Sequence, residues 1–112
     1  MLSDALLGLM SQHPILFASG SAEVRIEDLP VLDQVAAVVA TQPGLPVIIA
    51  GTTDTSGSVA TNERLARERA TAVSEELIAR GVPQNRLQVV SYGELFGENT
   101  DQARTIRFEV GS

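Results

Sequence analysis

Apolar residues recur at helical spacing in two long segments of the chain. The first runs from Asp28, a candidate N-cap, to Ala40, and Pro30 falls in its first turn, where proline is tolerated. The second covers residues 59–80 and stops before Gly81, which a proline follows two positions later. Both segments are predicted to be helices with one buried face. The buried stripe of the second helix consists of Leu65, Ala66, Ala70, Val73 and Leu77.

Four shorter apolar runs predict the strands of one sheet. Residues 15–17 form the first run, and residues 47–50, which are apolar on both sides, have the pattern of a central strand covered on two faces. Residues 87–92 and 105–110 follow, the last with alternating inward apolar and outward polar positions. The order β-α-β-α-β-β predicts an α/β sandwich, of α+β type, in which the two main helices pack on one face of a mixed sheet.

The first thirteen residues are predicted to be a lead-in that contains a short helix. Ser3 is a candidate cap, and His13-Pro14 ends the helical pattern. Residues 14–112 are expected to form a single domain. Because the apolar run near the start is too short to span a membrane and carries no basic flank, an export signal or membrane anchor is expected to lie outside this sequence.

Charge excludes two classes of partner. The 112 residues carry a formal net charge of -6, and the eight basic residues, all arginines, are scattered between Arg25 and Arg107. Nucleic acids and anionic membranes bind to clustered basic residues, which this sequence lacks, so neither is expected as a partner.

No pattern in the sequence predicts catalysis or metal binding. The absence of cysteine excludes disulfides and thiolate metal sites. His13 is the only histidine and has no nucleophile motif beside it, so a surface or linker role is expected. Glu94, Glu98 and Asp101 lie close together but lack the spacing of a calcium loop. We therefore expect no enzyme activity, no catalytic residue, no metal and no cofactor.

One arginine falls among the apolar positions of the second helix. Arg69 shares the arc of the buried stripe, and an unpaired buried charge costs several kcal/mol, so a partner or a ligand is expected. Asn62 precedes it by two turns on the same side, and Asp54 lies in the loop ahead of the helix. These residues fit either a pocket for a zwitterion or a structural ion pair between Asp54 and Arg69. From the spacing alone, the structural ion pair is favoured, because such pairs are common and perturbed charges mark functional sites only in part of the cases.

The order of these residues resembles a known family. Phe17 to Ala22, leading to Leu32-Asp33, resembles its first strand and helix, so that the similarity covers about residues 14–110. The main motif consists of Thr53-Asp54-Thr55-Ser56-Gly57, Asn62-Glu63-Arg64-Leu65, Arg69-Ala70, Val73, Leu77 and Gly81. With this motif, the chain resembles the OmpA-like C-terminal (OmpA/MotB-type) family of peptidoglycan-binding domains.

The resemblance implies non-covalent binding of peptidoglycan through the diaminopimelate residue of the stem peptide. Asp54 would accept hydrogen bonds from the ammonium group of diaminopimelate, and Arg69 would bind its carboxylate with two parallel hydrogen bonds. Both side chains are expected on a rim that water can reach. The implied ligand-binding residues are Thr53, Asp54, Thr55, Gly57, Asn62, Leu65 and Arg69.

The resemblance also implies where such a domain works. It would lie at the periplasmic face of the cell envelope and anchor a larger protein to the wall through a tethered membrane or envelope domain. Peptidoglycan of the diaminopimelate type is the expected partner, and assembly into a homodimer stays open.

Several positions depart from the family pattern. Thr52 stands where His or Tyr is usual, Ala66 where Ser is usual, and Ala103 where Asn is usual, while the loop 94–103 is shortened. These changes were expected to alter the rim of the site more than the fold. They support an alternative function, a scaffold of the same fold that has lost the ligand and serves protein-protein interaction or self-association.

Overall fold

The computed structural model describes residues 2–53, 58–93 and 104–110, and the structural statements below refer to these ranges. The helices are α1 (Leu2–Gln12), α2 (Leu29–Ala40) and α3 (Val59–Ala79), with short 3-10 turns at Ile26–Asp28 and Gln84–Arg86. The strands are β1 (Val47–Thr52), β2 (Leu87–Gly93) and β3 (Ile106–Val110).

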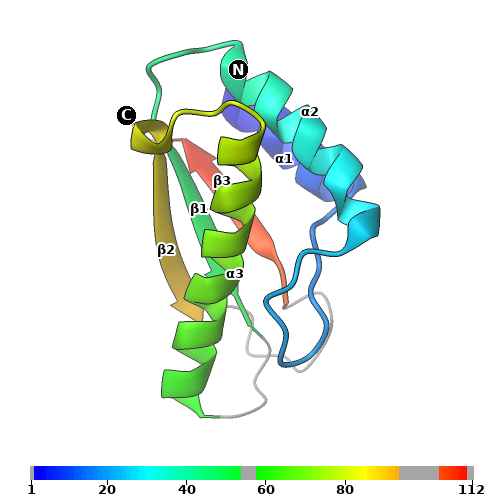
Figure 1. Ribbon diagram of the computed structural model, residues 1–112, viewed down its shortest axis with the longest axis vertical. Coiled ribbons are helices and arrows are strands. Elements are labelled where there is room, and N and C mark those ends of the chain that lie inside the picture. The colour runs from blue at the N-terminus through cyan, green and yellow to red at the C-terminus, as the bar shows by residue number, and fades with distance from the viewer. Residues whose placement is uncertain (1, 54–57, 94–103, 111–112) are drawn as a thin grey trace.

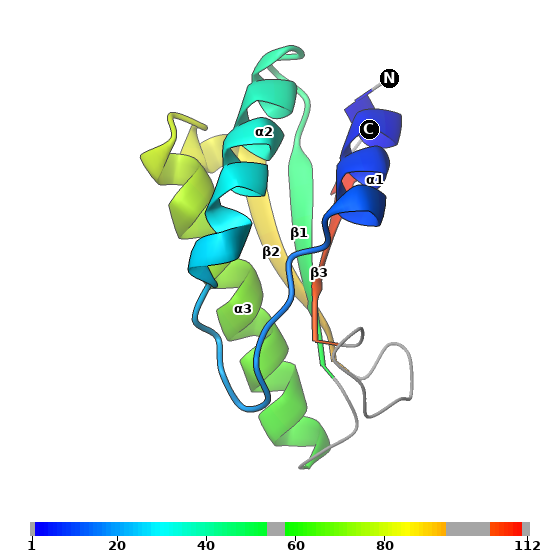
Figure 2. The same ribbon diagram turned by 90° about the vertical axis from the view of Figure 1, so that its right-hand side faces the viewer.

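The three strands form one mixed sheet in the order β2-β1-β3 (Figure 1). β1 is the central strand, parallel to β2 and antiparallel to β3, so that Ile49 pairs with Val89 on one side and Phe108 on the other. α2 and α3 cover one face of the sheet, while α1 lies beside the edge strand β3 (Figure 2). The predicted α+β fold with a mixed sheet is confirmed.

Residues 15–17 do not form the predicted first strand. Among the described residues, their only ladder contact is a single antiparallel bridge between Leu16 and Thr105. Side chains take the place of a strand partner, because the Leu16 amide donates to the Asp28 carboxylate (3.3 Å) and the Thr105 hydroxyl donates to the Ile15 carbonyl (2.5 Å). The segment is therefore extended and firmly bonded without being part of the sheet.

The core lies between the sheet and the helices. Residues on the inner face of β1 and β3 pack against apolar side chains of α2 and α3, and α1 adds Leu2 and Leu6 to the same core. β1 and α3 approach so closely that a Cβ on Gly51 would lie 1.8 Å from the carbonyl oxygen of Ala66. The predicted lead-in is thus packed onto the domain, and the proposed boundary at residue 13 stays a prediction.

α3 begins and ends close to the predicted bounds of residues 59–80. The Ser58 hydroxyl accepts a hydrogen bond from the Thr61 amide (3.1 Å) and caps the helix. At the other end Gly81 has a φ of 96°, which favours glycine and stops the helix. Arg80, directly before Gly81, contacts Asp33 of α2. Its hydrogen bonds to Glu76 and Asp33 raise the pKa of its guanidinium.

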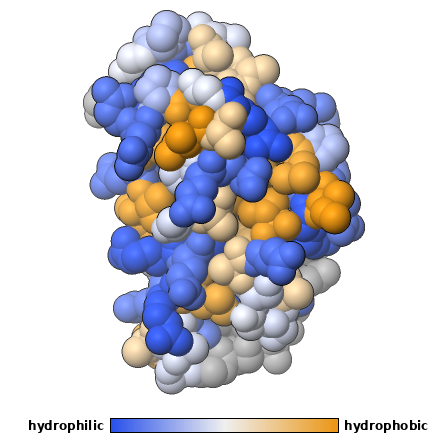
Figure 3. All heavy atoms as spheres, in the orientation of Figure 1, coloured by the Kyte–Doolittle hydropathy of each residue, from blue (hydrophilic) through white to orange (hydrophobic). Residues whose placement is uncertain are grey.

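The surface over α2 and α3 is mixed in character. Figure 3 shows hydrophobic side chains on this face as separate patches between hydrophilic ones. None of the helices in the described ranges is long and apolar enough to cross a membrane.

Candidate ligand-binding site

Arg69 lies on the buried face of α3, as the helical spacing predicts. Its guanidinium donates to three backbone carbonyls, from Nε to Ser21 (2.7 Å), from Nη1 to Thr52 (3.2 Å) and from Nη2 to Ala18 (3.1 Å). The Phe17 ring also contacts it, with 5.2 Å between the guanidinium carbon and the ring centroid. Arg69 therefore joins α3, the end of β1 and the turn that contains Ser21.

The burial of Arg69 corrects one expectation. We expected its side chain on a rim that water can reach, but Arg69 is 0% exposed. The reason is that the Arg69 side chain lies on the core side of α3, where its guanidinium N–H groups donate to main-chain carbonyls.

Two threonines at the end of β1 are buried beside this arginine. Thr52 accepts from Arg69 through its carbonyl, and its hydroxyl donates to the carbonyl of Thr105 (3.2 Å). Thr53 is 1% exposed, and its hydroxyl oxygen has no hydrogen-bond partner among the described residues. An unsatisfied buried hydroxyl costs free energy, so Thr53 is a candidate contact for a bound molecule.

The other predicted site residues divide into two groups. Asn62 is 3% exposed and lies on the same buried side of α3 as Arg69, whereas Leu65 is partly buried. Asp54, Thr55 and Gly57 lie outside the described residues, as do Ala103 and the rest of the loop 94–103. The structure therefore places Thr53 directly after β1 and both Asn62 and Arg69 on the buried side of α3, where Arg69 contacts the end of β1.

The departures at Thr52 and Ala66 do not alter an exposed rim. Both residues are 0% exposed, Thr52 in the network with Thr105 and Ala66 against Gly51. The expectation that these two changes affect the rim is thus wrong, because both positions belong to the packing beneath the site.

A family model described as the OmpA family matches residues 16–108. The chain belongs to the OmpA family. The match includes Thr53, Asn62 and Arg69, and it confirms the resemblance seen in the sequence.

Several relatives of this OmpA family chain are named as peptidoglycan-associated lipoproteins. The one from Rhizobium meliloti (strain 1021) is 35% identical over 80 residues, which are 71% of this chain and 46% of the relative. The one from Legionella pneumophila is 39% identical over 79 residues, which are 70% of this chain and 45% of the relative. The chain thus spans less than half the length of these two proteins, and neither carries the name of an enzyme.

Solved structures show the same fold. The peptidoglycan-associated lipoprotein from Burkholderia pseudomallei superimposes with a TM-score of 0.76 at 25% identity, covering 91% of both chains. The C-terminal domain of Helicobacter pylori MotB gives a TM-score of 0.77 at 23% identity, covering 88% of this chain and 85% of that one. The second likeness concerns the fold alone.

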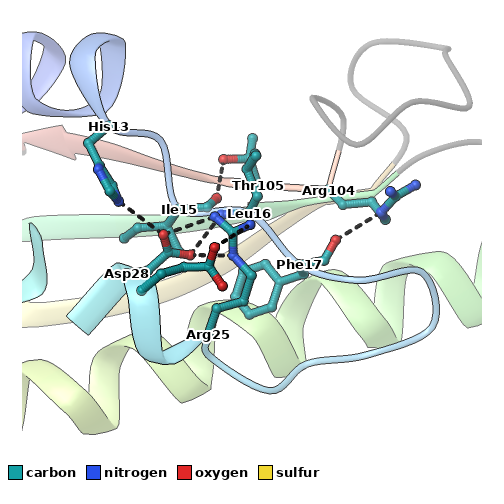
Figure 4. A network of polar contacts seen from close by, with 9 residues as sticks. His13, Ile15, Leu16, Phe17, Arg25, Asp28, Arg104 and Thr105 are labelled. Atoms are coloured by element: carbon teal, nitrogen blue, oxygen red, sulfur yellow. Dashed lines mark hydrogen bonds and ion pairs between the residues drawn. The ribbon is translucent and has the colours of Figure 1, made fainter.

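One polar network in this OmpA family domain was missed by the sequence analysis (Figure 4). Asp28 stands at the N-cap position of α2, but its carboxylate does not cap the helix. It is fully buried and accepts from Arg25 Nε and Nη2 (both 2.9 Å), while His13 Nε2 lies 3.1 Å from Oδ1. The pattern around Asp28 signalled only a helix start, because the partner His13 lies fifteen residues away in the sequence.

Arg104 forms hydrogen bonds with the segment of residues 15–17. Its Nε donates to the Phe17 carbonyl (2.9 Å), and its own carbonyl accepts from the Phe17 amide (2.9 Å). Figure 4 shows that Arg104 and the cluster of His13, Arg25 and Asp28 lie on opposite sides of the segment of residues 15–17. The segment that leads to the Ser21 turn is thereby fixed in place.

The chemistry of this site comes from its buried polar side chains. Within the described ranges no group of three or more His, Cys, Asp or Glu side chains could hold a metal ion. The region offers a buried cation, a buried hydroxyl and a buried amide side chain, which suit hydrogen bonds to an anionic or zwitterionic ligand.

Proposed function

We propose that this domain binds peptidoglycan non-covalently and anchors a larger envelope protein to the wall at the periplasmic face. The observation that carries the proposal is the Thr53 hydroxyl, buried without a partner among the described residues directly before Asp54 and beside the carbonyl that Arg69 binds. Membership of a family with relatives named as peptidoglycan-associated lipoproteins supports a polar wall ligand for this unsatisfied group.

The proposed contact is the diaminopimelate residue of the stem peptide. Its side-chain end carries an ammonium and a carboxylate on one carbon. Asp54 would accept from the ammonium, and Arg69 would donate to the carboxylate. The assignment of Asp54 rests on the family motif and on its place next to Thr53. A hydrogen bond between Arg69 and the ligand carboxylate would be strong in this buried position, because a charged hydrogen bond is stronger where water is excluded.

Co-sedimentation of the purified domain with insoluble sacculi tests the binding. Asp54→Asn should abolish sedimentation while the circular dichroism spectrum stays that of the folded protein. The matched control is Asp4→Asn, which removes the same charge from an exposed position on α1 and should bind like the wild type. Equal binding by both variants would refute the assignment of Asp54.

Soluble muropeptides test the ligand. Fragments with diaminopimelate should bind at least about tenfold more tightly than fragments with lysine at the same position, because lysine lacks the carboxylate that Arg69 would bind. If the two affinities are equal, Arg69 does not recognise that carboxylate. If the wild type does not sediment with sacculi, the alternative of a scaffold without ligand is favoured.

A further inference from the structure

Two turns of this protein are built in the same way around an arginine. In the turn Ala18–Ser21, the carbonyls of the first and fourth residues accept hydrogen bonds from Arg69. In the segment Gln42–Leu45, the carbonyls of the first and fourth residues accept from Arg86 (2.7 Å and 3.0 Å). The third residue of each is a glycine at positive φ.

The glycines hold these carbonyls in place. Gly20 has a φ of 73° and Gly44 a φ of 99°, a region that other residues enter only with strain. A Cβ would meet nothing within 4 Å at either position, so a substitution there acts through the backbone and not through a clash. The shape of each turn therefore determines where its two carbonyls, and the arginine bonded to them, lie.

The two turns differ in their distance from the candidate site. Arg86 belongs to the 3-10 turn before β2, and the Gly44 turn joins α2 to β1 at the opposite end of the molecule from the Gly20 turn (Figures 1 and 2). Arg69 is the buried cation of the site. A substitution of Gly20 thus perturbs a turn beside the site, and the same substitution of Gly44 perturbs a similar turn far from it.

We propose that the turn Ala18–Ser21 contributes to wall binding by positioning Arg69, without a need to contact the ligand itself. It positions the Arg69 guanidinium by bonding Nε and Nη2, while Thr52 bonds Nη1. An arginine fixed on three sides loses no further rotational freedom when a ligand binds, which raises affinity. This inference rests on the proposed function, in which Arg69 binds the ligand.

The Arg69 side chain reports this positioning directly. Its Nε–H donates to Ser21 at 2.7 Å, so its signal in a ¹⁵N correlation spectrum should move when the turn changes shape. Gly20→Ala should shift the Arg69 Nε–H signal, whereas Gly44→Ala should leave it in place and shift that of Arg86, whose Nε also donates to Leu45. This measurement needs no wall material.

Binding to sacculi then decides the functional role. Gly20→Ala and Gly44→Ala should lower the melting temperature by similar amounts, but only Gly20→Ala should weaken wall binding, by roughly tenfold, as for the loss of one charged hydrogen bond. If Gly20→Ala does not fold, the pair Gly20→Asn and Gly44→Asn carries less strain, because asparagine enters the left-handed region more readily. The same order of affinities is expected for that pair.

The outcomes separate this inference from the function on which it rests. If the wild type binds sacculi and the two variants of a pair bind equally, only the positioning role is overturned. An unmoved Arg69 signal in the Gly20 variants overturns it as well. If the wild type does not bind sacculi, the proposed function is overturned, and the role of the turn in binding falls with it.

Discussion

Replacing Arg69 with alanine should destabilise the whole domain and not only a binding contact. The substitution removes the donors for the carbonyls of Ala18, Ser21 and Thr52 and empties the volume of the largest fully buried side chain. Ala18 is exposed, so water can replace the lost donor there. The Thr52 carbonyl is buried, and an acceptor left unsatisfied in such a place costs about 1–3 kcal/mol.

The total effect follows from adding the packing loss. Truncating a large buried side chain to alanine costs about 2–5 kcal/mol, so together with the unsatisfied carbonyl we expect the free energy of unfolding to drop by about 3–8 kcal/mol. Since small domains are stable by about 5–15 kcal/mol, this is a large fraction of the total. Urea unfolding followed by far-UV circular dichroism measures the difference.

Arg67→Ala is the control for this experiment. Arg67 lies two residues before Arg69, which places it on the opposite side of the same helix, and it is exposed. Its replacement should change the free energy of unfolding by no more than about 0.5 kcal/mol. If the two variants unfold at the same urea concentration with the same slope, the buried hydrogen bonds of Arg69 contribute nothing and the reasoning is wrong.

Four further substitutions, of which Gly8→Ala is a control, test the fold by the same unfolding measurement. Gly51→Ala should lower the free energy of unfolding by about 1–3 kcal/mol or more, because its Cβ would overlap the backbone of α3, whereas Gly8→Ala in α1 meets no atom and should stabilise slightly. Asp28→Asn keeps the shape but removes the charge that Arg25 binds, and should cost about 1–3 kcal/mol. Ser58→Ala removes the cap of α3 and should cost about 0.5–2 kcal/mol; no change would mean that the observed cap does not stabilise the helix.

The helices and three of the strands could be predicted from the sequence because their signals are local. The stripe of α3 and the alternation of β3 reflect burial on one face, which repeats at a fixed spacing along the chain. Gly81 marks the end of α3 through its own backbone conformation. Such features depend on neighbours within a few residues.

The contacts of residues 15–17 could not be predicted, because they are made by distant side chains. An apolar run of three residues looks like a strand, yet its backbone groups bond to Asp28, Arg104 and Thr105. Nothing in the sequence connects positions that lie up to ninety residues apart. The structure reduces the predicted strand to one bridge for this reason.

The candidate site was predicted in part. Helical spacing places Arg69 and Asn62 on the buried side of α3, and the structure confirms both positions. The three acceptors of Arg69 are main-chain oxygens, which leave no trace in residue identity. The pairing of Arg69 with Asp54 stays a prediction.

The way Arg86 is bonded has a consequence for how this protein can vary. Its guanidinium binds the carbonyls of Val39, Gln42 and Leu45, and every amino acid offers the same carbonyl. Side chains at exposed positions of this loop, such as Gln42, can therefore be exchanged without loss of the bonds that shape it. A saturation library should show broad tolerance at Gln42 and near intolerance at Arg86, including to lysine, whose single ammonium cannot span three acceptors. Substitutions are therefore restricted at Arg86, which lies outside this loop, and largely permitted at exposed loop positions whose carbonyls Arg86 binds.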